Sequence, residues 1–123
     1  MTERRRFLRF DTALNALCEI VTDRCKTSSR IKNISKDGAL VILSQPLSQG
    51  CELKLSMDVP GDNIPIFASC QVAWQKEAGL ATSASQYETG VKFTKMDSSD
   101  RGRLLEYIYL QWLKLLDKPA KNI

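Results

Sequence analysis

Two stretches of strict alternation place the tightest limit on how this chain can fold. In residues 51–59 and again in residues 64–74, an apolar side chain occupies every second position. A strand with this period buries one face and leaves the other in water. Pro60-Gly61-Asp62-Asn63 lies between the two stretches and is a turn signal. The two stretches therefore predict an antiparallel hairpin.

Further strands are expected on both sides of this hairpin, where runs of β-compatible or apolar residues occur. They are residues 13–21, 30–34, 39–43 and 88–94, the last with Val91 and Phe93 inward and Lys92 outward. Residues 23–29 are polar and are interpreted as a turn. The 39–43 run is apolar throughout, which predicts a buried strand. Asp37-Gly38 is a second turn signal, because glycine accepts a positive φ without steric cost.

After Met96 the apolar period changes from two to three and four, which indicates a helix. The residues that carry this period are Leu104, Leu105, Ile108, Trp112, Leu115 and Leu116. Asp97 or Ser98 can cap the helix, Asp100 suits its positive end, and Pro119 ends it. About six strands followed by one helix predict a mainly β fold, a six-stranded antiparallel β-barrel with a C-terminal α-helix.

One domain is expected, because the chain has 123 residues. We divide it into a flexible basic arm (1–12), the barrel (13–95) and the C-terminal helix packed on the barrel (96–118). The sequence has no apolar leader and no window of membrane-spanning length, so we expect a cytoplasmic protein without a membrane span.

The net charge of +4, from 18 Lys and Arg against 14 Asp and Glu, favours small anionic partners over long nucleic acids. The chain has no histidine and four cysteines without a CxxC pair, so reduced, mostly buried thiols are expected rather than a metal site. Without histidine, Ser-His and Cys-His nucleophiles are excluded, and we expect a binding protein rather than an enzyme.

A basic motif near the start can bind an anion. Arg4, Arg5 and Arg9 keep their charge at physiological pH, and each planar guanidinium can make paired hydrogen bonds to a phosphate or to guanine O6 and N7. The same plane can stack on a purine. The arm is short and charged, so we expect it to become ordered when a ligand binds.

The predicted turn after residue 34 carries complementary chemistry. Asn33 offers both a donor and an acceptor to a base edge, and Ser35 offers a hydroxyl to a phosphate or a base. Gly38 permits close approach of a ligand. Either motif alone is more often a solvated basic terminus or an ordinary turn. Together they predict a site for a small guanine-containing phosphate ligand.

These residues resemble the motifs of PilZ domains, bacterial receptors for the second messenger cyclic di-GMP. The family motif RxxxR matches Arg5 and Arg9, and its longer form RRxxxR adds Arg4. The motif (D/N)xSxxG matches Asn33-Ile34-Ser35-Lys36-Asp37-Gly38, with asparagine where aspartate is more common. Val72-Ala73-Trp74 and Gly90-Val91-Lys92-Phe93 resemble recurring features of the fifth and sixth strands. The resemblance spans nearly the whole chain.

The resemblance implies a six-stranded barrel with a C-terminal helix that holds cyclic di-GMP between the two motifs, with no other cofactor. An arginine at the position of Arg4 often accompanies two intercalated ligand molecules per site. The output would pass through a protein effector. The sequence does not choose among motility, exopolysaccharide production, biofilm formation and virulence. A ligand-independent adaptor and a single-stranded nucleic-acid-binding barrel are the alternatives, and the low aromatic content of 7% disfavours the second.

Two further features involve aromatic side chains. Trp74 shares the parity of Ile64 and Val72, which favours a core position over stacking against the ligand, a role that some related domains give to a tryptophan there. On the last helix, Tyr107, Tyr109, Leu110 and Leu113 extend the apolar band beyond one packing face. This surplus predicts a homodimer or partner surface.

Overall fold

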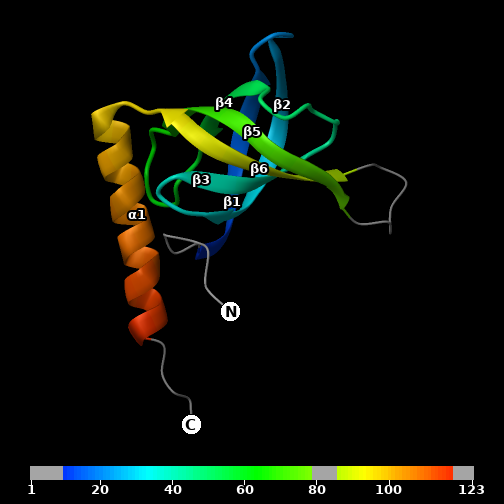
Figure 1. Cartoon of the computed structure of the whole chain (residues 1–123). Coiled ribbons are helices and arrows are strands. Elements are labelled where there is room, and N and C mark those ends of the chain that lie inside the picture. The colour runs from blue at the N-terminus through cyan, green and yellow to red at the C-terminus, as the bar shows by residue number, and fades with distance from the viewer. Residues whose placement is uncertain (1–9, 79–85, 118–123) are drawn as a thin grey trace.

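The computed structural model of the chain describes residues 10–78 and 86–117. Within them the chain forms six strands followed by one helix (Figure 1). The elements are β1 (Phe10–Ile20), β2 (Cys25–Ile34), β3 (Gly38–Leu43), β4 (Glu52–Met57), β5 (Ile66–Ala78), β6 (Gln86–Lys95) and α1 (Ser98–Asp117). Residues 1–9 of the predicted arm lie outside the described residues. The rest of the arm belongs to β1, which begins three residues before the expected strand.

The strands close into a barrel in the order β1-β2-β3-β6-β5-β4, and every neighbouring pair is antiparallel. β1 and β4 close the barrel through pairs from Ala16↔Met57 to Ile20↔Leu53. Closure leaves no free sheet edge between these strands. The predicted fold class, a six-stranded antiparallel barrel followed by a helix, is confirmed.

The alternating stretches supply much of the barrel core. The inward side chains of β4 and β5 are at most 4% exposed: Leu53, Leu55, Met57, Ile66, Ala68, Cys70 and Val72. The two strands pair from Glu52↔Gln71 to Met57↔Ile66, which confirms the predicted hairpin. Ile64 was expected to face inward with them, but it precedes β5 and is 62% exposed.

Register shifts interrupt the strand pairing at four places in the described barrel, and two of them change which side chains face inward. In β2 the register shifts between Ile31 and Asn33, so that Ile31 and Ile34 are both fully buried although they are three residues apart. In β5 the register shifts between Val72 and Trp74, and Trp74 is 46% exposed instead of buried. The core position expected for Trp74 is wrong, because a bulge adds one residue and reverses the parity beyond it.

The polar stretch at residues 23–29 is mostly strand, not turn. β1 ends at Ile20 and β2 already begins at Cys25. Arg24 has a φ of 55°, and its N–H donates to the Ile20 carbonyl at 2.8 Å, which closes a tight connection. Residues 25–29 of β2 pair with β1 but are exposed or half-buried, so hairpin pairing outweighs their polar composition. In β3, similarly, Leu40 and Ile42 are only half-buried, because one face points outward.

The helix packs on the barrel through a narrow face. Asp97 caps it as expected, accepting from the Ser99 N–H at 3.3 Å. Leu104 is 1% exposed, and Tyr107, which was expected on the surplus surface, is 8% exposed, with its hydroxyl 2.6 Å from Thr12 Oγ1. Leu105 and Trp112 were expected in the packed stripe but are exposed.

Arg103 fastens the helix to the β4–β5 connection. Its guanidinium donates to Asp62 Oδ2 at 2.6 Å and to Asp100 Oδ1 at 3.0 Å, and also to the Pro65 and Ile64 carbonyls. The bonds to Asp62 raise the pKa of Arg103 and lower that of Asp62. α1 therefore stands beside the barrel, and its last turns extend past the strands (Figure 1).

Candidate functional site

The turn between β2 and β3 is held by the side chain of Ser35. This residue is only 4% exposed. Its Oγ accepts from the Asp37 N–H at 3.3 Å and donates to the Gly38 carbonyl at 3.4 Å, while the Ser35 N–H donates to the same carbonyl at 2.9 Å. Ser35 therefore fixes the shape of the turn from inside it.

Gly38 is required by crowding rather than by a positive φ. Positive φ occurs at Gly50 and Gly61 among the described glycines, not at Gly38, so the expected reason was wrong. Gly38 pairs with Lys92 of β6, and a Cβ added at Gly38 would lie 2.2 Å from the Val91 carbonyl oxygen. The glycine lets β3 approach β6 closely directly after the turn.

One row of paired residues crosses the barrel wall from this turn to the exposed tryptophan. Asn33 of β2 pairs with Leu40 of β3, Leu40 with Gly90 of β6, and Gly90 with Trp74 of β5. A register shift lies at each end of this row, at Ile31/Asn33 in β2 and at Val72/Trp74 in β5. Three inter-strand spacings make the row roughly 14 Å wide. We call these four residues the Asn33–Trp74 row.

The indole of Trp74 lies directly against Gly90. A Cβ added at Gly90 would be 2.3 Å from Trp74 Nε1, so any larger residue would displace the ring. At the next residue of β5, Gln75 Nε2 donates to the buried Thr89 Oγ1 at 2.9 Å and to the Gln45 carbonyl at 3.2 Å. These bonds anchor β5 next to the bulge. The indole is thereby supported on one side, and 46% of the residue is exposed.

The described part of β1 begins next to the same turn. Phe10 pairs with Ile34 and Asp11 pairs with Asn33, so the chain enters the barrel beside the first residues of the motif. Arg4, Arg5 and Arg9 of the basic motif precede Phe10 and lie outside the described residues. The structure thus brings Asn33, Ser35 and Gly38 together in one turn, with Trp74 at the far end of its row.

Lys92 was expected to point outward, but it was not among the residues predicted for the site. It is exposed and pairs with Gly38 on one side and Gln71 on the other. Two other lysines nearby are paired instead, since Lys32 and Lys76 lie 3.4 and 3.7 Å from Glu88. In the sequence, the only sign of a role for Lys92 is its position two residues after Gly90, on the same side of the strand. The pairing of Lys92 with Gly38 in the sheet is what shows that Lys92 borders the turn.

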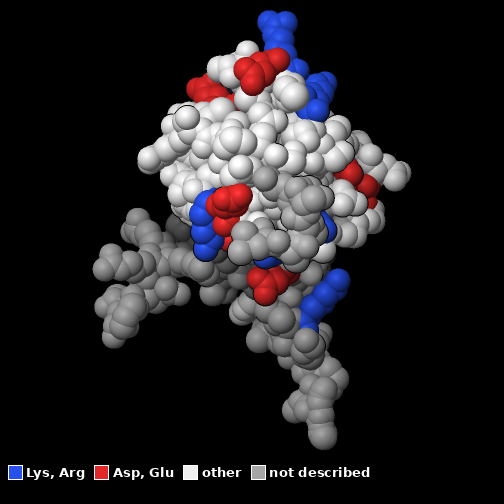
Figure 2. Space-filling model, turned by 90° about the vertical axis from the view of Figure 1, so that its right-hand side faces the viewer, with Lys and Arg blue, Asp and Glu red and all other residues white. Residues whose placement is uncertain are grey.

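Charged side chains are scattered on the face of the barrel that Figure 2 presents. The described Lys and Arg residues there are separated by uncharged surface, and several lie beside Asp or Glu. A duplex-binding or strand-binding surface would present a continuous basic field. The described Lys and Arg residues on this face do not form such a field.

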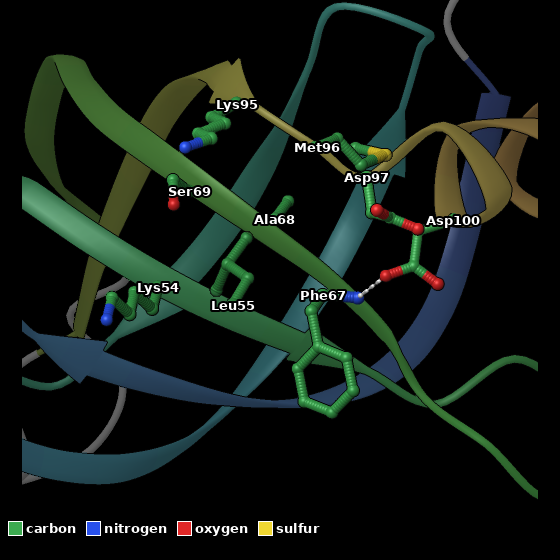
Figure 3. Close-up of a pocket in the computed structure, with 9 residues that line it drawn as sticks. All are labelled: Lys54, Leu55, Phe67, Ala68, Ser69, Lys95, Met96, Asp97 and Asp100. Carbon is green, nitrogen blue, oxygen red and sulfur yellow. Dashed lines mark hydrogen bonds between the residues drawn. The ribbon is translucent and has the colours of Figure 1, made fainter.

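A hollow of about 310 Å³ lies on a different part of the wall, formed by β4, β5 and β6 (Figure 3). Lys54, Ser69 and Lys95 form one row across it. At its other end Asp100 accepts from the Phe67 N–H at 3.3 Å. None of the residues predicted for the site lines this hollow. The hollow contains lysines but neither motif, so substitutions in it can serve as controls for substitutions in the proposed site.

The cysteines divide into two pairs. Cys18 and Cys70 are buried in the barrel, and burial raises the pKa of each thiol from 9.0 to about 12. Cys25 is exposed and Cys51 is half-buried, so fewer thiols are buried than expected. Among the described residues no group of three or more Cys, Asp or Glu could hold a metal ion. No helix in the same part of the chain has the length and apolarity needed to span a membrane.

Comparisons with known proteins place this fold in a family. The sequence model of the PilZ domain matches residues 3–110, so the chain belongs to the PilZ domain family. No curated protein sequence matches it. The PilZ domain of Escherichia coli YcgR, solved with c-di-GMP, is similar in structure, with a TM-score of 0.72, 15% identity, and coverage of 98% of this chain and 100% of that one.

Two longer proteins contain a similar fold. The K. pneumonia MrkH–c-di-GMP complex has a TM-score of 0.74 and 19% identity over 95% of this chain and 55% of that one. The Bacillus subtilis inhibitor of motility MotI/DgrA has a TM-score of 0.69 and 21% identity over 92% of this chain and 53% of that one. The chain therefore spans about half the length of these two proteins.

Proposed function

We propose that this chain is a receptor for cyclic di-GMP, which binds on the outer face of β2, β3, β6 and β5. The observation that carries this proposal is the Asn33–Trp74 row, which has a bulge next to half-buried Asn33 and another next to exposed Trp74, beside the Ser35–Gly38 turn. Bulges commonly re-aim side chains at binding sites. The YcgR and MrkH structures with c-di-GMP support the choice of ligand.

The turn contributes recognition of a guanine. The Asn33 amide offers a donor and an acceptor, the pattern needed to read a base edge. Ser35 acts by holding the turn through its bonds to Asp37 and Gly38, and Gly38 keeps this corner free of side-chain bulk. At the far end of the row, the supported indole of Trp74 offers a flat surface against which a second base can stack.

The arginines contribute the phosphate contacts. Because Phe10 pairs with Ile34, the segment that carries Arg4, Arg5 and Arg9 joins the barrel beside the turn. Guanidinium groups can bridge phosphates and guanine edges at the same time, and Lys92 adds a positive charge next to Gly38. Arg4 supports a stoichiometry of two intercalated ligands per chain.

The proposed activity is binding without catalysis, in the cytoplasm, with the ligand ordering the arm and so changing the surface offered to a protein effector. Titration calorimetry tests the ligand. The chain should bind cyclic di-GMP and not GMP or cyclic GMP. Arg5→Ala and Arg9→Ala should each weaken binding by on the order of 1.5–3 kcal/mol, because a charge-assisted bond is lost. Neither substitution should change the unfolding midpoint.

Lys54→Ala is the matched control, because it removes an exposed cation from the hollow on β4, β5 and β6 rather than from the proposed site. It should leave the affinity unchanged. If cyclic di-GMP does not bind while oligonucleotides bind with a steep salt dependence, the alternative of a nucleic-acid-binding barrel is favoured. Absence of both activities favours a ligand-independent adaptor.

A further inference from the structure

The helix α1 is apolar on two opposite sides. One side packs on the barrel through Leu104 and Tyr107, which are 1% and 8% exposed. On the other side, Leu105, Tyr109 and Trp112 are 42%, 54% and 38% exposed. We call these three residues the helix seam. The rings of Tyr109 and Trp112 lie 6.2 Å apart, so they form one continuous surface. Apolar residues gathered in this way mark an interaction surface.

The spacing within the helix seam is that of a coiled coil. Leu105 and Tyr109 are four residues apart, and Tyr109 and Trp112 are three apart. At 100° per residue the three side chains emerge within an arc of about 60°. This is the d-a-d pattern of a heptad repeat, in which each residue packs between side chains of a second helix. The seam therefore fits a helix better than it fits a flat surface.

Charges beside the helix seam indicate which helix it fits. In the same heptad frame, Arg101 occupies position g and Glu106 occupies position e of the following heptad. In a parallel coiled coil, g of one helix lies opposite e of its partner five residues further on. Two copies of α1 side by side would therefore bring Arg101 against Glu106 twice. Within the described residues, neither side chain forms an ion pair.

We propose that α1 forms a parallel two-helix coiled coil with a second copy of this chain through the helix seam. The barrel leaves this side of the helix free, because Leu104 and Tyr107 face the barrel and the last turns of α1 extend past the strands (Figure 1). The next e position, Leu113, is a half-buried apolar residue that widens the contact, whereas Ile108 at position g packs against the barrel core. This dimer does not depend on the proposed ligand.

Sedimentation velocity of the full chain, without nucleotide, tests the dimer. The wild-type chain should shift from monomer to dimer as its concentration rises. Tyr109→Ser should weaken the dimer by about tenfold or more, because an aromatic at the centre of an interface is lost. Phe67→Ser is the matched control, since both aromatic residues are 54% exposed but Phe67 lies on β5. A wild-type monomer at all concentrations, or equal effects of the two substitutions, overturns the proposal.

Charge reversal tests the register and leaves the apolar surface intact. Glu106→Arg should weaken the dimer, because Arg101 of each copy then faces a second guanidinium in place of a carboxylate. Adding Arg101→Glu should restore it, because the pairs become opposite again. If the double variant is no tighter a dimer than Glu106→Arg alone, the proposed pairing is wrong. Far-ultraviolet circular dichroism of both variants should match that of the wild type.

Disulfide trapping tests the orientation. In a Cys25→Ser background, which removes the exposed thiol, Leu105→Cys should form a covalent dimer on mild oxidation, because equivalent d positions face each other in a parallel pair. The Cys25→Ser parent is the control and should stay uncrosslinked. A dimer that is trapped only when Leu105→Cys and Tyr109→Cys are mixed would be antiparallel, because d then lies opposite a, and would overturn the parallel arrangement.

Discussion

The wall that carries the Asn33–Trp74 row and the outer side of α1 are both exposed, but their backbones are constrained very differently. A Cβ at Gly38 would lie 2.2 Å from the Val91 carbonyl, and one at Gly90 would lie 2.3 Å from the Trp74 indole. In α1, a Cβ at Gly102 would meet nothing within 4 Å. Gly38 and Gly90 are thus needed for the close packing of the barrel wall, whereas Gly102 is not needed for the packing of the helix.

This difference indicates how each region works. On the barrel wall, close packing of β3, β6 and β5 sets the positions of the turn and of the indole before any ligand arrives. Such preorganisation reduces the entropy lost on binding. The outer side of the helix has no such constraint, and its proposed role depends on the spacing of its side chains. Adding a methyl group to a glycine of the wall should therefore destabilise the fold, whereas adding one to the helix glycine should not.

The largest expected effect is on stability. Gly38→Ala should destabilise the fold by about 3 kcal/mol, because the new methyl group meets backbone that cannot move without shifting β6. Gly102→Ala should instead stabilise it by about 0.5–1 kcal/mol, because alanine favours a helix interior. Chemical denaturation at one protein concentration measures both. Equal effects of the two substitutions would remove the contrast between wall and helix.

A smaller effect is expected on ligand binding, where the two tryptophans can be compared. Trp74→Ala should weaken cyclic di-GMP binding by about 1–3 kcal/mol, because a stacking surface is lost. Trp112→Phe should leave the affinity unchanged, because Trp112 belongs to the helix seam. Titration calorimetry gives the affinities. Quenching of tryptophan fluorescence by the ligand should persist in Trp112→Phe and disappear in Trp74→Phe, and the reverse result would place the ligand at the helix.

Much of the fold could be predicted because its patterns are local. Alternation in β4 and β5 depends only on which side of a strand each residue faces, and the Asp97 cap is a contact within one turn. The bulges could not be predicted. They depend on pairing between strands that are distant in sequence, and the bulge at residue 73 reversed the expectation for Trp74. The helix period likewise did not show which of its two apolar sides meets the barrel.

The candidate site was predictable in part for the same reason. Asn33, Ser35 and Gly38 are close in sequence, so their turn could be recognised directly. The register that brings Lys92 beside Gly38 is not visible in the sequence. The reason for Gly38 was also hidden, because the carbonyl it must avoid belongs to Val91 on another strand.

Mapping of amide chemical shifts during a titration with cyclic di-GMP tests the central claim most directly. We expect the largest changes at the amides of residues 33–38 and Lys92 and at the Trp74 indole N–H, with little change at Lys54, Ser69 and Lys95. Changes concentrated at those last three residues, or no change anywhere, would contradict the account.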